Sequence, residues 1–223
     1  HAWYAEILED ILERLTQANL GWRVLITTTT ERHAAMLAVA NRYGIDTRFL
    51  IVENRGRDVL PFLIAAHQLL EEGVDVVLKL HTKLSPHRSD GNAWRDELLD
   101  RLIGPSTARD AGTMFRDEPK SGLIAPSGHT QPMTYYWGAN QSRVQTLLGQ
   151  AGVTCDDPAR QTFVSGSMFW VRLESLRPLL DANLAPSDFE EESAQVDGTL
   201  AHAIERVFGL CVRHAGFMTV DSP

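Results

Sequence analysis

The sequence has few cysteines, no long apolar run and no excess of positive charge, and each shortage argues against a class of protein. Its two cysteines, Cys155 and Cys211, lie far apart, so they form neither a disulfide framework nor a CxxC metal site. No apolar run approaches the roughly 20 residues of a membrane helix, and no signal peptide is visible. The net charge of -8 argues against a nucleic-acid partner. We therefore expect a cytoplasmic protein without an integral membrane segment, with any membrane anchor in other domains of a longer protein.

Two phosphate-binding motifs are also missing. The sequence contains no GxxxxGK[ST] loop and no GxGxxG after a strand, which argues against a P-loop or dinucleotide-binding enzyme. Its 223 residues suffice for one substantial core. We expect a single domain, residues 1–223, excised from a longer protein.

The apolar pattern alternates between helical and strand periods. Helices are expected over residues 7–15, 31–44, 61–70, 93–104, 142–152 and 199–209. Strands are expected over residues 22–29, 47–53, 74–82, 121–128, 163–172 and 210–220. Short connections between alternating strands and helices predict an α/β fold with a mostly parallel central sheet flanked by helices. Ligands of such sheets gather at the carboxyl ends of the strands.

The segment NRGRD carries unusual charge for a turn between a strand and a helix. Arg55 and Arg57 flank Gly56, so two guanidinium groups and freed backbone amides could converge on a phosphate. Asp58 could hold an arginine or accept from a ligand hydroxyl, and Asn54 begins the loop. The alternative is that Asp58 pairs with an arginine and the loop only joins two elements, since surface ion pairs are common.

The segment KLHTK lies at the end of another expected strand. Alternation places Lys79, His81 and Lys83 on one side, with Leu80 and Thr82 on the other. A solvated sheet edge would also explain the pattern, but burying lysines without an anion is costly. Lys79 is the weakest candidate because it precedes the loop. We expect the two loops to form one anion-binding rim.

Carboxylates gather in an acidic loop before the last expected helix. Asp197 directly precedes that helix, where it could be either a catalytic base or a helix N-cap. His202 and Arg206, four residues apart, share one helix face. Of the run Glu190–Glu192 only one carboxylate is expected to matter, and Glu192 is the candidate.

Aromatic residues beside glycines provide candidates for binding sugar rings, which offer apolar C–H faces. Tyr135, Tyr136 and Trp137 lie in an expected loop. Trp170 is a further candidate for acceptor binding, although core packing is the simpler interpretation for Phe169 and Trp170 on a strand.

Five motifs occur in order along almost the whole chain: NRGRDVLPFL, KLHTK, WRDELLDRLIG, FVSGSMFWVR and QVDGTLAHAIER. Together they resemble the rhamnan synthesis F family of bacterial polysaccharide glycosyltransferases. The resemblance implies a GT-A-like fold with a nucleotide-sugar half, about residues 1–120, and an acceptor half, about 121–223. It also implies transfer of a sugar, typically rhamnose from dTDP-rhamnose, to a lipid-linked O-antigen or rhamnan glycan at the inner membrane face.

The usual metal-binding Asp-x-Asp of GT-A enzymes is replaced here by His81-Thr82-Lys83. We therefore expect transfer without a required metal cofactor, in which Arg57, His81 and Lys83 neutralise the leaving diphosphate. Asp197 is the first candidate base, Glu192 the second, and His202 could orient either. The missing carboxylates also support an alternative, a non-catalytic module that binds nucleotide-sugar or glycan.

Overall fold

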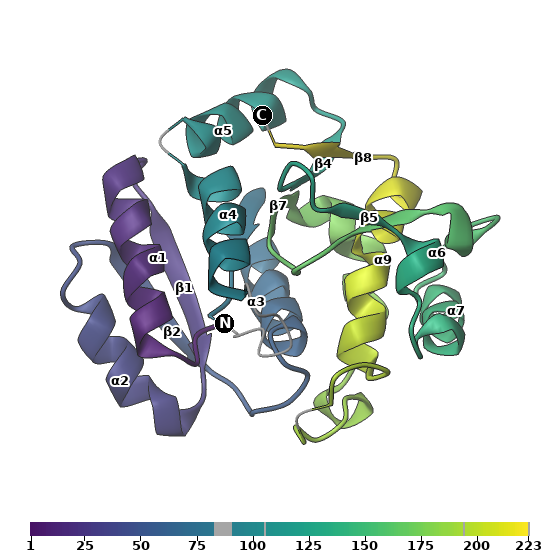
Figure 1. The fold of residues 1–223 in the computed structure, drawn as a ribbon, viewed down its shortest axis with the longest axis horizontal. Helices are drawn as coiled ribbons and strands as arrows, with labels where there is room; N and C mark the ends of the chain where they lie inside the picture. The colour runs from purple at the N-terminus through teal and green to yellow at the C-terminus, as the bar shows by residue number, and fades with distance from the viewer. Residues whose placement is uncertain (83–90, 105, 194, 223) are drawn as a thin grey trace.

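The computed structural model describes residues 1–82, 91–104, 106–193 and 195–222. It is a mixed α/β structure, shown in Figure 1. The α-helices are α1 (Ala5–Ala18), α2 (Thr30–Ala40), α3 (Val59–Glu71), α4 (Gly91–Ile103), α5 (Thr107–Asp117), α6 (Met133–Tyr136), α7 (Gln141–Gln150), α8 (Arg177–Leu180) and α9 (Leu200–His214). The strands are β1 (Arg23–Thr28), β2 (Asp46–Ile51), β3 (Val76–Lys79), β4 (Ser121–Ala125), β5 (Thr130–Pro132), β6 (Thr162–Val164), β7 (Phe169–Arg172) and β8 (Met218–Asp221). In the described part of the chain, no helix is both long and apolar enough to cross a bilayer.

The main sheet is mixed, so the expected mostly parallel sheet is not confirmed. Its four strands lie in the order β3-β7-β4-β8. β7 runs antiparallel to both neighbours, whereas β4 and β8 are parallel. β1 and β2 form a separate parallel pair, and β5 and β6 a small antiparallel one. The difference arises because β7 inserts between β3 and β4, although it follows both in the sequence.

Helices cover both faces of the main sheet. Because successive side chains of a strand point to opposite faces, the side chains of this sheet belong to two separate cores. Leu123 and Phe169 belong to a core with residues of α3, α7 and α9. Their strand neighbours Ile124 and Trp170 belong to a core with residues of α1, α2, α4 and α5. Figure 1 shows α1, α2, β1 and β2 at one end of the molecule and α6 and α7 at the other.

The last helix is longer than the sequence predicts. Gly209 was expected to end it, but α9 continues to His214, and β8 begins only at Met218. Gly209 does not have a positive φ. A Cβ added there would lie 3.6 Å from Thr219 Oγ1, an ordinary van der Waals contact, so neither the backbone conformation nor crowding requires glycine at this position. The expected aromatic loop contains the short helix α6, and α5 was not predicted.

The first residues connect β1 with β3. The backbone N–H of Ala2 donates to Thr27 O on β1 at 2.9 Å. The amino group of His1 donates to Leu80 O, and the N–H of Thr82 donates to His1 O at 3.0 Å. The hydroxyl of Thr82 also accepts from the N–H groups of Trp3 and Tyr4, at the start of α1.

Candidate functional site

The loop of residues 54–58, here the NRGRD loop, turns through two successive left-handed residues. Gly56 has φ +66° and Arg57 has φ 59°. A Cβ at Gly56 would lie 2.6 Å from both Leu60 Cβ and the ring of Phe189. Glycine is therefore required both by the backbone conformation and by the close approach of the acidic loop, residues 187–198.

The NRGRD loop binds the acidic loop directly. The backbone N–H of Arg57 donates to Glu192 Oε1 at 2.8 Å, across 135 residues of sequence. Its guanidinium donates to Gln195 O at 2.6 Å. Arg55 donates to Phe189 O at 2.8 Å and lies 3.4 Å from the exposed carboxylate of Glu191. The segment expected to bind the donor and the segment expected to carry the base are thus brought together.

Asp58 lies beneath this contact in a buried ion pair. Its Oδ2 accepts from Lys79 Nζ at 2.7 Å, and both side chains are 2% exposed. Lys79 also donates to the backbone oxygen and the hydroxyl of Ser167, at 2.6 and 2.9 Å. The expected partner of Asp58 was an arginine or a ligand, and its observed partner is the lysine that the sequence ranked lowest. Lys79 is central to the site's architecture, where it joins β3 to the start of α3.

His81 and Thr82 are buried rather than exposed on a rim. His81 Nε2 lies 2.8 Å from Gly166 O, beside the Ser167 contact of Lys79. Thr82 is 1% exposed and uses its hydroxyl at the start of α1. Lys83 lies outside the described residues. Among the described residues, the outward-facing part of the expected anion rim consists of Asn54 and the two arginines, of which Asn54 is exposed.

Asp197 connects the acidic loop to residues 135–140, here the aromatic segment. Its Oδ1 accepts from Asn140 Nδ2 at 2.6 Å and its Oδ2 from the N–H of Ala139 at 2.9 Å. Arg206 lies 3.8 Å away. Burial alone would raise the pKa of Asp197, but the bonds from Asn140, Ala139 and Gly198 and the charge of Arg206 together lower it below its usual value.

His202 has a structural contact at the start of α9. The N-cap of α9 is Thr199, not Asp197, and its hydroxyl accepts from the N–H of His202. The His202 ring lies 2.7 Å from the same hydroxyl, and the residue is 6% exposed. Glu190 binds nearby, where it accepts from the N–H of Leu200 and pairs with Arg143 at 2.7 Å.

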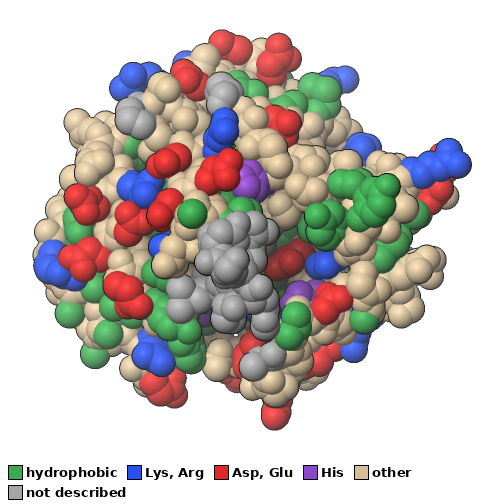
Figure 2. Space-filling model, in the orientation of Figure 1, with side chains coloured by type: hydrophobic (Ala, Val, Ile, Leu, Met, Phe, Trp, Pro, Cys, Tyr) green, Lys and Arg blue, Asp and Glu red, His purple; other side chains and the backbone are tan. Residues whose placement is uncertain are grey.

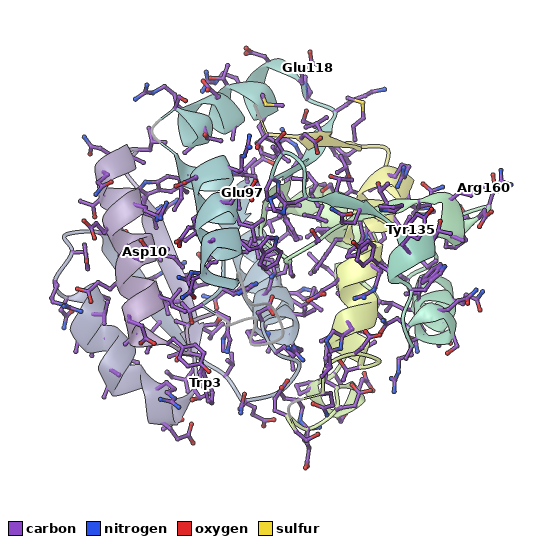
Figure 3. The ribbon with its side chains drawn as sticks, in the orientation of Figure 1. Trp3, Asp10, Glu97, Glu118, Tyr135 and Arg160 are labelled. Atoms are coloured by element: carbon purple, nitrogen blue, oxygen red, sulfur yellow. The ribbon has the colours of Figure 1, made fainter. Side chains whose placement is uncertain are left out.

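The candidate aromatic residues differ in exposure. Tyr135 is 83% exposed and Tyr136 is 48% exposed, and Figure 3 shows Tyr135 extending from α6. Trp137 is half-buried and packs against the core. Trp170 is buried, donates its indole N–H to Leu102 O at 3.0 Å and stacks near Trp22. Its assignment to acceptor binding was wrong, because this side chain belongs to the core.

Side chains that the sequence did not single out hold the site together. The Ser167 hydroxyl accepts from the ammonium of Lys79, and the side-chain amide of Asn140 donates to the carboxylate of Asp197. Arg206, which the sequence had placed on one helix face with His202, supports them: it donates to Tyr136 O and lies over the ring of Phe163 at 5.1 Å. The only sequence signal for Ser167 and Asn140 was the position of small or polar residues within the motifs SGS and GAN.

The charged surface on the visible face is mixed rather than basic. Figure 2 shows acidic and basic side chains side by side over α1 and α4. Arg14, for example, pairs with Asp10 at 3.0 Å and also with Asp100. Among the described residues, no group of three or more His, Cys, Asp or Glu side chains could hold a metal ion. The side chains of His81 and Thr82, where a metal-binding motif would lie, include no carboxylate and do not fit a magnesium or manganese site.

The family model described as rhamnan synthesis protein F matches residues 1–217. The chain belongs to this family. Two relatives from strains of Xanthomonas campestris pv. campestris, both described as uncharacterized protein WxcX, are 47% identical over 216 residues. The match covers 97% of this chain but 31% of each relative. No solved structure matches this rhamnan synthesis F chain. Membership of the rhamnan synthesis F family indicates a role in polysaccharide synthesis.

Proposed function

We propose that this domain is a GT-A-like glycosyltransferase that moves a sugar from a nucleotide donor to a growing bacterial surface polysaccharide. The proposed donor is dTDP-rhamnose and the proposed acceptor a lipid-linked O-antigen or rhamnan glycan, at the cytoplasmic face of the inner membrane. Family membership supports the polysaccharide role. The whole protein's substrates belong to the same proposal, because the chain spans about a third of the curated relatives it matches.

One observation carries the proposal: the acidic loop contacts both segments proposed to bind the two substrates. Through Glu192 and Gln195 it binds Arg57 of the NRGRD loop. Through Asp197 it binds the segment that follows the exposed tyrosines, at Ala139 and Asn140. A transferase needs carboxylates between a charged donor and a sugar acceptor, and this loop lies between the segments proposed for them.

The chemistry requires one proton acceptor and one region of positive charge. The acceptor hydroxyl loses its proton to a carboxylate as its oxygen attacks the anomeric carbon. The bond from that carbon to the donor diphosphate breaks, and the diphosphate departs with the bonding electrons. Arg55 and Arg57 each have five N–H donors, of which the described contacts use only part, so both could bind the departing diphosphate.

We propose Glu192 as the proton acceptor in preference to Asp197, which the sequence placed first. Both oxygens of Asp197 accept hydrogen bonds, and its pKa is lowered, which makes it a weaker base. Glu192 is half-buried and accepts one described hydrogen bond, from Arg57, at Oε1. Asp197 then holds the acidic loop to the aromatic segment.

A second candidate function is a non-catalytic module that binds nucleotide-sugar or glycan. The observation that favours it is the burial of Asp58, His81 and Thr82, which leaves fewer groups to face a diphosphate than the sequence predicts. Such a module would bind a ligand without turning it over, while another part of the longer protein performed the chemistry.

Nucleotide binding is tested by thermal shift with dTDP, UDP and GDP, each with manganese or with EDTA. A ligand at 100 times its Kd stabilises the folded state by about 2.7 kcal/mol. We expect stabilisation by dTDP that persists in EDTA and is lost in Arg57→Ala and in Lys83→Ala. If both variants bind dTDP like the parent, the NRGRD loop has only a structural role.

Measuring sugar transfer distinguishes the transferase from the non-catalytic module, and Glu192 from Asp197 as the proton acceptor. We expect Glu192→Gln in the full-length protein to lower sugar transfer by on the order of 100-fold or more, and Asp197→Asn to lower it less. Glu174→Gln is the matched control, since Glu174 pairs with Arg177 in an exposed contact outside the site. Nucleotide binding with no transfer by the parent protein would favour the non-catalytic module. The opposite order of the two variants would restore Asp197 as the base.

A further inference from the structure

A groove of about 430 Å³ lies between β6 of the small sheet and β8 of the main sheet. Gly209 of α9 lies between the two strands, because a Cβ added there would be 3.6 Å from Thr219 Oγ1 on β8 and 3.7 Å from Thr162 O on β6. The hydroxyl of Thr130 on β5 donates to Asp221 Oδ1 on β8 at 3.0 Å, beside the groove. Figure 1 shows β5, β8 and the end of α9 in the same part of the molecule. The described lining includes no residue of the NRGRD loop or of the acidic loop.

Gly209 leaves space at this groove. It is buried in the interior of α9, where glycine destabilises a helix relative to alanine. Its φ is not positive, and a methyl group would meet only ordinary contacts. Glycine here therefore provides one thing that alanine would remove, which is an open space beside Thr219 Oγ1 and Thr162 O.

The side of β8 that borders the groove presents polar groups. Thr219 Oγ1 is buried and has no hydrogen-bond partner in the described chain. β8 is the outer strand of the main sheet, and the N–H of Met218 donates to Lys120 O on its inner side. Because backbone groups alternate along a strand, the N–H and C=O of Thr219 face outward, toward the groove.

Two charged side chains of opposite sign line the same groove. Arg213, in the last turn of α9, is exposed and has no ion-pair partner among the described residues. Asp221 is exposed, and its described contact uses only Oδ1. Because these two charges cancel, the lining has no excess of positive charge that would favour a phosphate or diphosphate.

Apolar side chains supply much of the remaining lining, among them Phe163, Phe217 and Met218. A neutral ligand with hydroxyl groups at its rim and C–H groups on its faces fits this combination, because a hydroxyl both donates and accepts. Sugar rings have this chemistry, and charged side chains form charge-assisted bonds to their hydroxyls. The ring of Phe163 also contacts that of Tyr136, with 5.9 Å between the centroids, so the groove lies next to the aromatic segment.

We propose that the groove between β6 and β8 is a second glycan-binding site, which holds neutral sugar units of the polysaccharide away from the reaction centre. A sugar hydroxyl in the space beside Gly209 bonds to Thr219 Oγ1, and Arg213 and Asp221 bond hydroxyls at the rim. The volume lies within the range of small-ligand pockets, roughly 300–1,000 Å³. Holding the glycan at a second point raises the effective concentration of its end at the aromatic segment. The choice of a sugar as the ligand rests on the proposed function.

Methyl NMR of the full-length protein, with ¹³C-labelled methionine methyl groups, tests the site. Met218 lines the groove and is 45% exposed, and Met218→Leu identifies its signal. The probes are the methyl glycosides of rhamnose, mannose, galactose and N-acetylglucosamine. We expect at least one of them to shift the Met218 signal saturably, while the signal of Met36, buried in the other core, stays unchanged. If none of the glycosides shifts the Met218 signal, the proposal is overturned.

Gly209→Ala separates a loss of binding from a loss of folding. Alanine favours the helix, so this variant should unfold at no lower urea concentration than the parent. Its methyl group should nevertheless weaken glycoside binding at Met218 by about 3- to 10-fold, and Thr219→Val, which removes the unpartnered hydroxyl, by a similar factor. Gly112→Ala, within α5, is the matched control and should bind like the parent, because a Cβ there meets nothing within 4 Å. Equal binding by Gly209→Ala and the parent would place the sugar elsewhere and overturn the proposal.

The readout at Met218 does not depend on sugar transfer, so the two proposals can fail separately. Glycoside binding at Met218 by a protein that transfers no sugar would contradict the transferase and support the groove. Sugar transfer by a protein whose Met218 signal does not respond would contradict the groove alone.

Discussion

The ammonium of Lys79 and the carboxylate of Asp58 lie 2.7 Å apart, and neither side chain is more than 2% exposed. Removing one partner leaves an uncompensated buried charge, which costs about 3–5 kcal/mol. We expect Lys79→Met and Asp58→Asn each to lower the free energy of unfolding in urea by this amount. The double variant should lose less than the sum of the two. Additive losses would show that the two groups do not depend on each other.

Asp197 predicts a pH-dependent contribution to stability. Its pKa is lowered in the folded state, so the carboxylate stabilises that state above its ordinary pKa of 3.8. This contribution is lost as pH falls through the lowered folded pKa. We expect Asp197→Asn to reduce the free energy of unfolding at pH 7 by about 1–3 kcal/mol, and the difference to shrink below about pH 4. Asp117→Asn, at the exposed end of α5, is the control and should show no such trend. A difference that stays constant down to pH 2 would contradict the assigned contacts.

Adding even a methyl group at Gly56 should destabilise the NRGRD loop. A methyl group there would overlap Leu60 and the ring of Phe189, in a left-handed conformation that side chains disfavour. We expect Gly56→Ala to destabilise the protein by about 2–4 kcal/mol, measured by urea unfolding. Gly44→Ala is the matched control, because a Cβ there meets nothing within 4 Å. Equal stability of the two variants would mean that the acidic loop does not pack on Gly56.

The two thiols should differ in reactivity. Burial raises the pKa of Cys211 to about 12, whereas Cys155 is half-buried. We expect one thiol of the native protein to react with a disulfide reagent at pH 8, and Cys155→Ser to remove that reaction. Cys211 should react only after unfolding. Rapid reaction of two thiols in the native protein would contradict the burial of Cys211.

Local periodicity predicted most of the helices and strands, but it could not predict which strands are neighbours. The pairing of β3 with β7 depends on contacts such as Lys79 with Ser167, 88 residues apart. Gly209 has the local character of a helix end, yet it lies within α9, where its neighbours Phe208 and Leu210 are buried in the core. These features depend on the tertiary structure and leave little local signal.

The sequence identified many residues of the candidate site, but it did not predict which of them contact one another. The argument that a buried lysine needs an anion was correct for Lys79, although the anion is Asp58 and not a ligand. Trp170 is an aromatic side chain of the kind that stacks on sugar rings, but its position on β7 buries it. The bond between Arg57 and Glu192 joins residues 135 positions apart, so no spacing rule would indicate it.

The contact between Lys79 and Ser167 also has a consequence for the time course of synthesis. At roughly 5–20 residues per second, Ser167 leaves the ribosome some 4–18 s after Lys79. During that interval Asp58, only 21 residues earlier in the chain, is already available to pair with the lysine, whereas β7 does not yet exist. A nascent chain therefore has to keep β3 from pairing with other strands until its neighbour emerges, and the charge of Lys79 within that short strand would discourage such mispairing.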